Sequence, residues 1–421
     1  MPSRPFVCAF CICTVVLLET AACSFAVENS DSMPKEIRPS VPWWNREVAT
    51  GDWDGARSRL EAKGFKLEAN YVGEVQSNLR GGLNTANATK YLGSVDLTTT
   101  LDFEKLAGLK GGKLFLWFTD VHGEGISEDE IGDYQLISNL DAKPFSTLYE
   151  YWYRQEFLNG GAWVLGGRFD ANVNFAVSSN GNTFIHSSFG HPPNIEFDTY
   201  PNTGIGVQAG FKIDASSTIQ AMVQDGAANE NSIGGWHRAF SHSHGMIGML
   251  EYQLTPPFLP ATLPGTYKFG VWKHTGDFAS VPAQTPQKTV RGNEGFYVLA
   301  DQQVFREHPQ LKDDAQGLAL FAQVARAPEN RNDVGLYAGG GFVYTGVFLG
   351  RDQDKLGIGA AHAKFSDRLP KSAETAFELY YRVQATPFLS IKPSVEYVVN
   401  PNGRKDIDDA LAAGVRVEIH F

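Results

Sequence analysis

One predicted strand in the first half of the chain combines charged side chains with an aromatic surface. Along residues 145–157, Glu150, Trp152 and Arg154 point to one side of an extended chain. The other side carries aromatic rings, namely Tyr149, Tyr151, Tyr153 and Phe157. Carboxylate and guanidinium groups exchange hydrogen bonds with hydroxyl groups, and an indole ring offers a flat apolar face. The first side therefore suits weak binding of a neutral polyhydroxylated compound.

The next predicted strand, 162–170, follows after a short turn and adds polar groups to the same region. Arg168 and Asp170 are expected to point the same way as Trp152, and Asn172 lies directly beyond the strand. Charged side chains also line a wall simply to keep it hydrated, and any one of these residues fits that role. The candidate binding residues are Glu150, Trp152, Arg154, Arg168, Asp170 and Asn172.

The end of the chain indicates which kind of element carries these residues. Val415, Val417, Ile419 and Phe421 point one way in an extended strand, whereas the residues between them are polar. The last strand of a bacterial outer-membrane β-barrel has this form, with its apolar face against lipid and its polar face in a hydrated lumen. A soluble β-sandwich would show the same alternation.

The rest of the chain favours a closed antiparallel barrel of 16 strands with a short helix before it. The strands are expected at 65–78, 90–103, 112–122, 145–157, 162–170, 203–213, 216–224, 244–254, 265–275, 293–305, 317–327, 334–347, 354–365, 373–386, 389–400 and 411–421. Long and short connections mostly alternate, as outer loops and periplasmic turns do. An even strand count places both ends of the barrel on the periplasmic side.

The two longest outer connections, 123–144 and 171–202, are long enough to fold into the lumen and narrow it. Three consecutive glycines, Gly339 to Gly341, weaken the strand that contains them. They could mark the part of the wall against which such a loop packs. A local bend or bulge would explain them equally well.

The N-terminus predicts an exported protein. A short basic start is followed by the apolar run Phe6 to Leu18 and by the small-residue site Ser24-Phe25-Ala26, which is the layout of a signal peptide covering residues 1–26. Lipidation of Cys23 is the alternative. All four cysteines precede Val27, so disulfides and thiolate chemistry are not expected. Residues 27–64 should form a periplasmic segment with a helix near Asp54–Lys63, and residues 65–421 the barrel.

Composition and motifs argue against several function classes. A formal net charge of −11 disfavours nucleic acid as a partner. The motifs of a hydrolase nucleophile elbow, a phosphate-binding loop and a zinc protease are missing, so neither catalysis nor a cofactor is expected. His237, His242 and His244 could hold a metal, although histidines near a loop are more often simply exposed.

Short segments from about residue 50 to the C-terminus resemble the carbohydrate-selective porins of the OprB family. They are Gly51-Asp-Trp-Asp-Gly-Ala-Arg-Ser-Arg-Leu60, Tyr91-Leu-Gly-Ser-Val-Asp-Leu97, Leu148-Tyr-Glu-Tyr-Trp152, Gly167-Arg-Phe-Asp-Ala-Asn172, Phe184-Ile-His-Ser-Ser-Phe-Gly190 and Tyr397-Val-Val-Asn-Pro-Asn-Gly403. Asp54 and His186 depart from this pattern, where glycine and asparagine are more usual.

The resemblance implies a 16-stranded barrel in the outer membrane of a Gram-negative bacterium that passes mono- or small oligosaccharides by diffusion. Its partners would be sugars in transit, outer-membrane lipid and the barrel-assembly machinery, with a monomer or homotrimer as the functional unit. Phe421 would be the assembly signal, as is expected of outer-membrane barrels in general. A general or carboxylate-selective porin is the alternative. Mixed acidic and basic residues in the predicted lumen suit neutral solutes better than anions.

Overall fold

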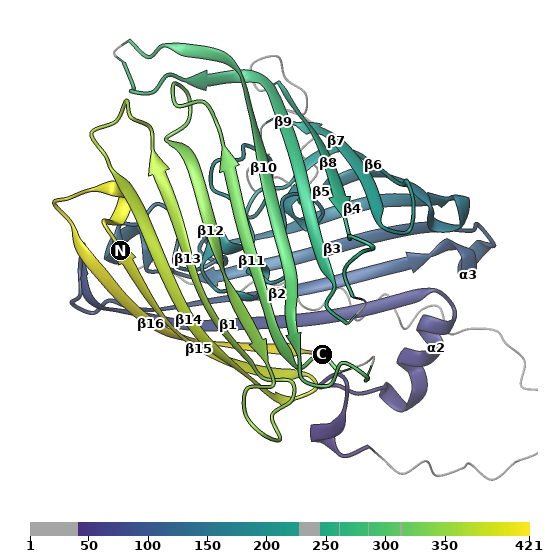
Figure 1. Cartoon of the computed structure of the whole chain (residues 1–421). Coiled ribbons are helices and arrows are strands. Elements are labelled where there is room, and N and C mark those ends of the chain that lie inside the picture. Colours follow the sequence, from purple (N-terminus) through teal and green to yellow (C-terminus); the bar gives the residue numbers. More distant parts are fainter. Residues whose placement is uncertain (1–40, 227–244, 261, 285, 312–313) are drawn as a thin grey trace, which may run out of the picture. The chain divides into compact units, whose positions relative to one another are not determined.

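The computed structural model describes residues 41–226, 245–260, 262–284, 286–311 and 314–421. Within them, 16 strands form one closed sheet in which each strand pairs antiparallel with its sequence neighbours and β1 pairs with β16 (Figure 1). The strands are β1 (Phe65–Gly82), β2 (Thr89–Asp102), β3 (Gly112–Gly123), β4 (Phe145–Phe157), β5 (Ala162–Phe169), β6 (Gly204–Lys212), β7 (Ser217–Asp225), β8 (Met246–Leu254), β9 (Gly265–Ala279), β10 (Thr289–Arg306), β11 (Gly317–Arg326), β12 (Val334–Thr345), β13 (Lys355–Phe365), β14 (Ala373–Thr386), β15 (Leu389–Val399) and β16 (Asp408–His420).

The fold prediction is confirmed, and the soluble sandwich is excluded because the sheet closes on itself. Every predicted strand overlaps one observed strand. The largest differences are in β1, which continues to Gly82, and in β9 and β10, which form a longer hairpin than expected. The short helix before the barrel is present as α2 (Ala56–Ala62), preceded by the 3₁₀ turns η1 (Trp43–Asn45) and η2 (Trp53–Gly55).

Alternating burial explains why these sequences form a barrel. In β11 the side chains of Phe321, Gln323 and Ala325 are buried inside, whereas Leu320 and Val324 are exposed on the outside. An apolar outer face can meet lipid, and closure leaves no strand edge with unpaired backbone groups. Among the described residues, no helix is long and apolar enough to cross a membrane.

The short helical elements lie in the connections. They are α3 (Phe103–Ala107) after β2, the π-helical turn η3 (Ser127–Ile131) after β3, and η4 (Leu158–Gly160) after β4. The connection after β5 holds η5 (Ala171–Val173), η6 (Gly181–Thr183) and α4 (Ser187–Gly190), and η7 (Pro401–Gly403) follows β15. The C-terminus and α2 lie at the same end of the barrel (Figure 1).

Residues 124–144 and 170–203 fold into the barrel, as predicted for the two longest outer connections. We call them inner loop A and inner loop B. Loop A donates the backbone N–H groups of Tyr134 and Gln135 to Glu374 on β14, at 2.7 and 2.9 Å. Loop B reaches several strands of the wall and buries Phe175, Phe184 and Phe189 against them. The lumen is therefore partly filled by the chain itself.

Two paired glycines leave the inner face of the barrel wall without side chains where inner loop B packs. Gly359 on β13 pairs with Gly341 on β12, and both face the lumen. A Cβ atom on Gly359 would lie 2.8 Å from the Phe189 ring and 3.0 Å from the Phe184 ring. The strand pairing continues through Gly339–Gly341 without a register shift. The structure thus supports a packing surface for the loop, and the bulge interpretation of the three glycines is wrong.

The two ends of the described chain are tied together at the barrel rim. The N–H of Ala49 donates to the carbonyl of His420, and the N–H of Phe421 donates to the carbonyl of Ala69, both at 2.8 Å. The predicted signal peptide, the cleavage site and the alternative lipidation of Cys23 all lie outside the described residues.

Candidate pore-lining site

A register shift in β4 sets the orientation of the candidate residues. Trp117 of β3 pairs with Glu150, but the next residue, Phe118, pairs with Leu148, so Tyr149 is an extra residue. This bulge turns both Tyr149 and Glu150 toward the lumen. Tyr149 packs edge-on against Trp117 and is only 2% exposed. The expectation that Tyr149 faces outward with Tyr153 and Phe157 is therefore wrong, because sequence alternation alone does not reveal a bulge.

Glu150 connects β4 to the start of inner loop B. One carboxylate oxygen accepts the indole N–H of Trp152 at 2.9 Å, and the other accepts the backbone N–H of Asp170 at 2.8 Å. The side chain is 3% exposed. Both oxygens are thus occupied by protein donors, so Glu150 holds its neighbours in place.

Trp152 presents part of its ring to the lumen. It stacks on Phe115 of β3, with ring centroids 4.8 Å apart and planes inclined by 24°. The neighbouring Trp117 donates its indole N–H to Asp96 at 2.8 Å. We call Phe115, Trp117 and Trp152 the aromatic strip. All three are partly exposed, so the strip gives the inner wall a flat apolar surface.

Arg154 continues this face toward the barrel end that carries the C-terminus. Its guanidinium lies 4.5 Å from the centroid of the Trp163 ring and 3.3 Å from the carboxylate of Glu156. About a third of each charged side chain is exposed. Arg154 therefore remains within reach of a solute in the lumen.

Arg168 is placed differently from the prediction. Its backbone pairs with Tyr151 and with Ile205, which puts Arg168 on the face opposite to Leu165 and Phe169. Leu165 and Phe169 belong to the inner apolar cluster. The Arg168 side chain is 2% exposed, and its Nε donates to Thr203 Oγ1 at 2.7 Å. Arg168 thus lies beside the candidate group but does not line the lumen with it.

Asp170 and Asn172 begin inner loop B. Asp170 accepts hydrogen bonds from Tyr149 Oη at 2.6 Å, from the N–H of Asn172 at 2.8 Å and from the N–H of Tyr200 at 3.2 Å. Burial raises the pKa of Asp170, and the hydrogen bonds from Tyr149 and Thr199 oppose that rise. Asn172 donates to the carbonyl of Phe175 at 3.1 Å and is partly exposed. Asp170 fixes the loop, while Asn172 stays accessible.

Four buried carboxylates of the wall hold the inner loops by accepting backbone N–H groups. Glu251 accepts from Ala176 at 3.0 Å, and Glu378 accepts from Ile185 and His186 at 2.9 Å. Asp301 accepts from Ser179 and Asn180 at 3.1 and 2.9 Å, and Glu374 holds loop A. Sequence analysis missed these residues, since on a strand each one looks like any polar lumen-facing position.

A row of cations lines the wall formed by the last four strands, and sequence analysis missed it too. Lys355 pairs with Arg382, and Lys392 pairs with Arg416, all on the lumen face. Glu418 lies 3.6 Å from both Arg382 and Lys392. The side chains of Arg382 and Glu418 are 20% and 23% exposed, so both can meet a solute.

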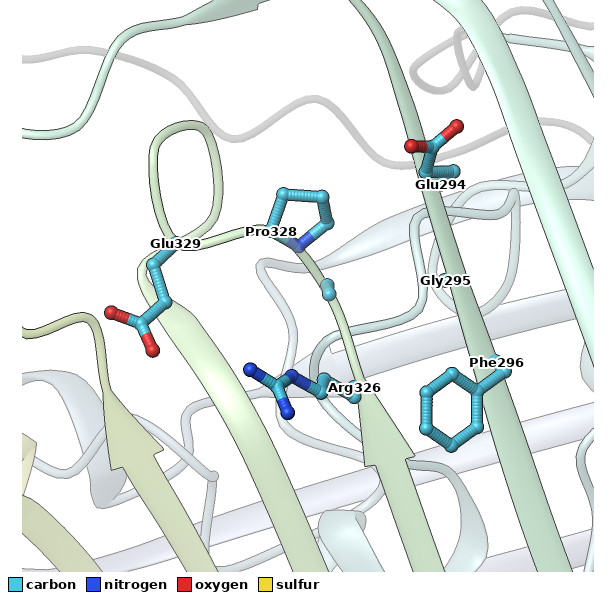
Figure 2. Close-up of a pocket in the computed structure, with 7 residues that line it drawn as sticks. Glu294, Gly295, Phe296, Arg326, Pro328 and Glu329 are labelled. Atoms are coloured by element: carbon cyan, nitrogen blue, oxygen red, sulfur yellow. The ribbon is translucent and has the colours of Figure 1, made fainter.

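The pocket drawn in Figure 2 lies away from this face. It is a hollow of about 410 Å³ on the outer surface of β10 and β11. Glu294, Phe296 and Arg326 line it, and Phe296 pairs with Arg326 on the exposed face. Within the described ranges, no three His, Cys, Asp or Glu side chains are grouped to hold a metal. The candidate histidines 237, 242 and 244 fall outside those ranges.

Comparisons with known proteins agree with the barrel fold. The family model described as "Carbohydrate-selective porin, OprB family" matches residues 86–421. The chain is 27% identical to Porin B of Pseudomonas aeruginosa, over 90% of this chain and 92% of that protein. It is 22% identical to the putative porin QuiX of Acinetobacter baylyi, over 90% and 94% of the two chains.

Solved structures show the same fold. The high-pH structure of Pseudomonas putida OprB superposes with a TM-score of 0.79 at 24% identity, covering 90% of this chain and 99% of that one. The low-pH structure of the same protein superposes with a TM-score of 0.61 at 22% identity. The chain therefore belongs to the OprB family of carbohydrate-selective porins, which are channels for diffusion of carbohydrates across the outer membrane of Gram-negative bacteria.

Proposed function

We propose that carbohydrates of one to a few rings cross the lumen between the aromatic strip and the cation row of β13–β16. The observation that carries this proposal is the stack of Trp152 on Phe115, which leaves a partly exposed aromatic surface on the inner wall. The apolar face of a pyranose ring can lie on such a surface while its hydroxyl groups exchange hydrogen bonds with nearby polar groups.

The candidate residues then divide into two roles. Trp152, Arg154 and Asn172 are partly exposed and contact the sugar in transit. Glu150 and Asp170 are buried with their oxygens occupied, so they position Trp152 and inner loop B. Arg168 stabilises the C-terminal end of β5 from the other face of the sheet. This division replaces the expectation that all six candidate residues contact the sugar directly.

Contacts of this kind are weak, which transit requires, since a tightly bound solute would block the channel. Passage is passive, and the protein performs no chemistry on the solute. A second candidate is preferential passage of carboxylates, because four cations line the wall of β13–β16, namely Lys355, Arg382, Lys392 and Arg416. Glu378, Glu396 and Glu418 face the lumen from the same strands, and Arg416 is bound to Glu74 at 2.6 Å, so the mixed charges favour neutral solutes.

We further propose that residues 1–26 are removed on export, that residues 27–64 remain in the periplasm, and that residues 65–421 form the barrel in outer-membrane lipid. The barrel-assembly machinery would recognise the C-terminal strand that ends in Phe421. The porin would act as a monomer or a homotrimer.

Single channels in a planar bilayer test the substrate class. Monosaccharides and disaccharides should reduce the ion current in a saturable way, and di- and tricarboxylates at equal concentration should not. Saturable block by the carboxylates alone would favour the second candidate. A current that falls only with solution viscosity would mean a general porin.

A further inference from the structure

The outer face of β11 carries a guanidinium group at the edge of the apolar band. Arg326 pairs with Phe296 on one side and with Leu336 on the other, and Leu336 pairs with Lys364. Directly opposed residues share a face of the sheet, so the cations of Arg326 and Lys364 lie in one row on the outside of the barrel. Phe296 is 45% exposed and Leu336 is 38% exposed.

This row borders the hollow of about 410 Å³ shown in Figure 2. Apolar groups of Phe296, Ala327 and Pro328 line part of it, and Arg326, Glu294 and Glu329 supply its charges. In the described part of the chain, the guanidinium of Arg326 makes no hydrogen bond or ion pair. The hollow thus combines an exposed apolar surface with a guanidinium that no carboxylate of the hollow contacts.

The nearby carboxylates lie close to other donors or cations and do not contact Arg326. Glu329 accepts the backbone N–H of Asp367 at 3.0 Å, and Asp367 in turn lies 3.0 Å from the ammonium of Lys364. Glu294 sits opposite Lys273 on β9. Lys364 is paired with Asp367, whereas Arg326 lines the hollow without such a pair and stays open to an external anion.

The position of the row identifies the source of that anion. Loop 327–333 lies at the barrel end that carries inner loops A and B, opposite to the C-terminus. Longer loops of outer-membrane barrels are extracellular, so this rim meets the headgroups of the outer leaflet. Below the row, Val298 and Val324 are exposed and continue the apolar band. An occupant must therefore present an anionic group to Arg326 and an apolar part to the band.

We propose that the Arg326 hollow binds the phosphate-bearing headgroup of an outer-leaflet glycolipid, with Lys364 as a second cation and the acyl chains along Phe296 and Val324. Arginine matches phosphate with two parallel hydrogen bonds and is the side chain best suited to this contact. The site is separate from the sugar passage, because it lies on the other face of the same sheet.

Native mass spectrometry of the detergent-solubilised full chain tests this assignment. The protein is titrated with diphosphoryl lipid A and with the phosphate-free form of the same lipid. The affinity for diphosphoryl lipid A should fall about tenfold in Arg326→Gln, as expected when a charge-assisted contact is lost. Arg326→Lys should retain part of the affinity. Arg404→Gln is the matched control, since Arg404 is an exposed arginine of an outer loop that pairs with Asp406.

The sugar-induced block of ion current serves as the folding control and should be unchanged in all three variants. Equal binding of diphosphoryl lipid A by the wild type and Arg326→Gln would overturn the assignment. Binding of the phosphate-free lipid as tightly as the diphosphoryl form would do the same. If inorganic phosphate binds as tightly as the lipid and depends on Arg326 equally, the hollow is a phosphate site and not a lipid site.

Discussion

The carboxylate of Glu378 and the backbone N–H of Ile185 are hydrogen bonded at 2.9 and 3.1 Å through both carboxylate oxygens, although 193 residues separate them in sequence. Glu378 also accepts the N–H of His186 at 2.9 Å. A carboxylate has only acceptor sites, so it can satisfy several converging N–H groups of a loop that has no strand partner. This contact fastens inner loop B to β14 on the lumen side of the barrel wall.

Replacing this carboxylate should release inner loop B. Glutamine has one acceptor oxygen, and its amide group would face N–H donors, so Glu378→Gln leaves buried donors unsatisfied at a cost of about 1–3 kcal/mol. We expect a larger and noisier single-channel current and faster proteolysis within residues 171–202. Glu128→Gln, at an exposed position of inner loop A, should behave like the wild type. Identical currents and cleavage rates in both variants would mean that other contacts hold the loop.

The close contact between Gly359 and inner loop B should be equally sensitive to substitution. A Cβ at this position would meet the rings of Phe189 and Phe184 at 2.8–3.0 Å. Gly359→Ala should lower the free energy of unfolding by about 1–3 kcal/mol, as overpacking of a tight core does. Gly166→Ala is the control, since a Cβ there meets nothing within 4 Å. Chemical denaturation in detergent measures both, and equal midpoints would contradict the packing role of the glycine.

Acid should weaken inner loop B through His186. The imidazole is 1% exposed, and burial lowers the pKa of His186 to about 3 from the ordinary value of 6.5. Because the folded-state pKa is the lower one, the stabilisation by the neutral ring is complete above about pH 6.5 and is lost as the pH falls toward 3. The loss is about 1.4 kcal/mol per pH unit in that window.

Asparagine at position 186 removes this titration while keeping an acceptor for the N–H of Ser188, which the ring accepts at 3.3 Å. The difference in loop proteolysis between wild type and His186→Asn should therefore grow from pH 6.5 to pH 4. Burial raises the pKa of Asp170 and of Glu196, and both variants share these effects. A difference that does not change with pH would show that His186 stays neutral or is not buried in solution.

Sequence patterns predicted the strands because lumen-facing residues alternate with lipid-facing ones, and this alternation holds along most of each strand from β1 to β16. The site was less predictable. The bulge at Tyr149 adds one residue to β4, which no alternation rule locates, and Arg168 lies on the face opposite to the one expected. Glu378 could not be recognised either, because its role depends on a loop that is distant in sequence.

Removal of Phe421 should block assembly more than it weakens the barrel. Its backbone N–H makes one hydrogen bond to Ala69, while the pairing of β1 with β16 continues from His420 upward. The truncated chain should accumulate unfolded in the periplasm, yet it should refold in detergent nearly as well as the full chain. Normal insertion in cells would refute recognition of the terminal residue, and failure in both settings would point to a structural role.

The sugar affinity of Trp152→Ala is the most direct test of the proposed passage, measured as sugar-induced block of single-channel current. Loss of the aromatic surface should weaken the block by roughly twofold to tenfold, the size expected for one weak contact, while the channel stays open. Arg168→Ala, on the opposite face of the sheet, should leave the affinity unchanged. Unchanged affinity in Trp152→Ala would contradict the account and would move selectivity from the aromatic strip to the inner loops.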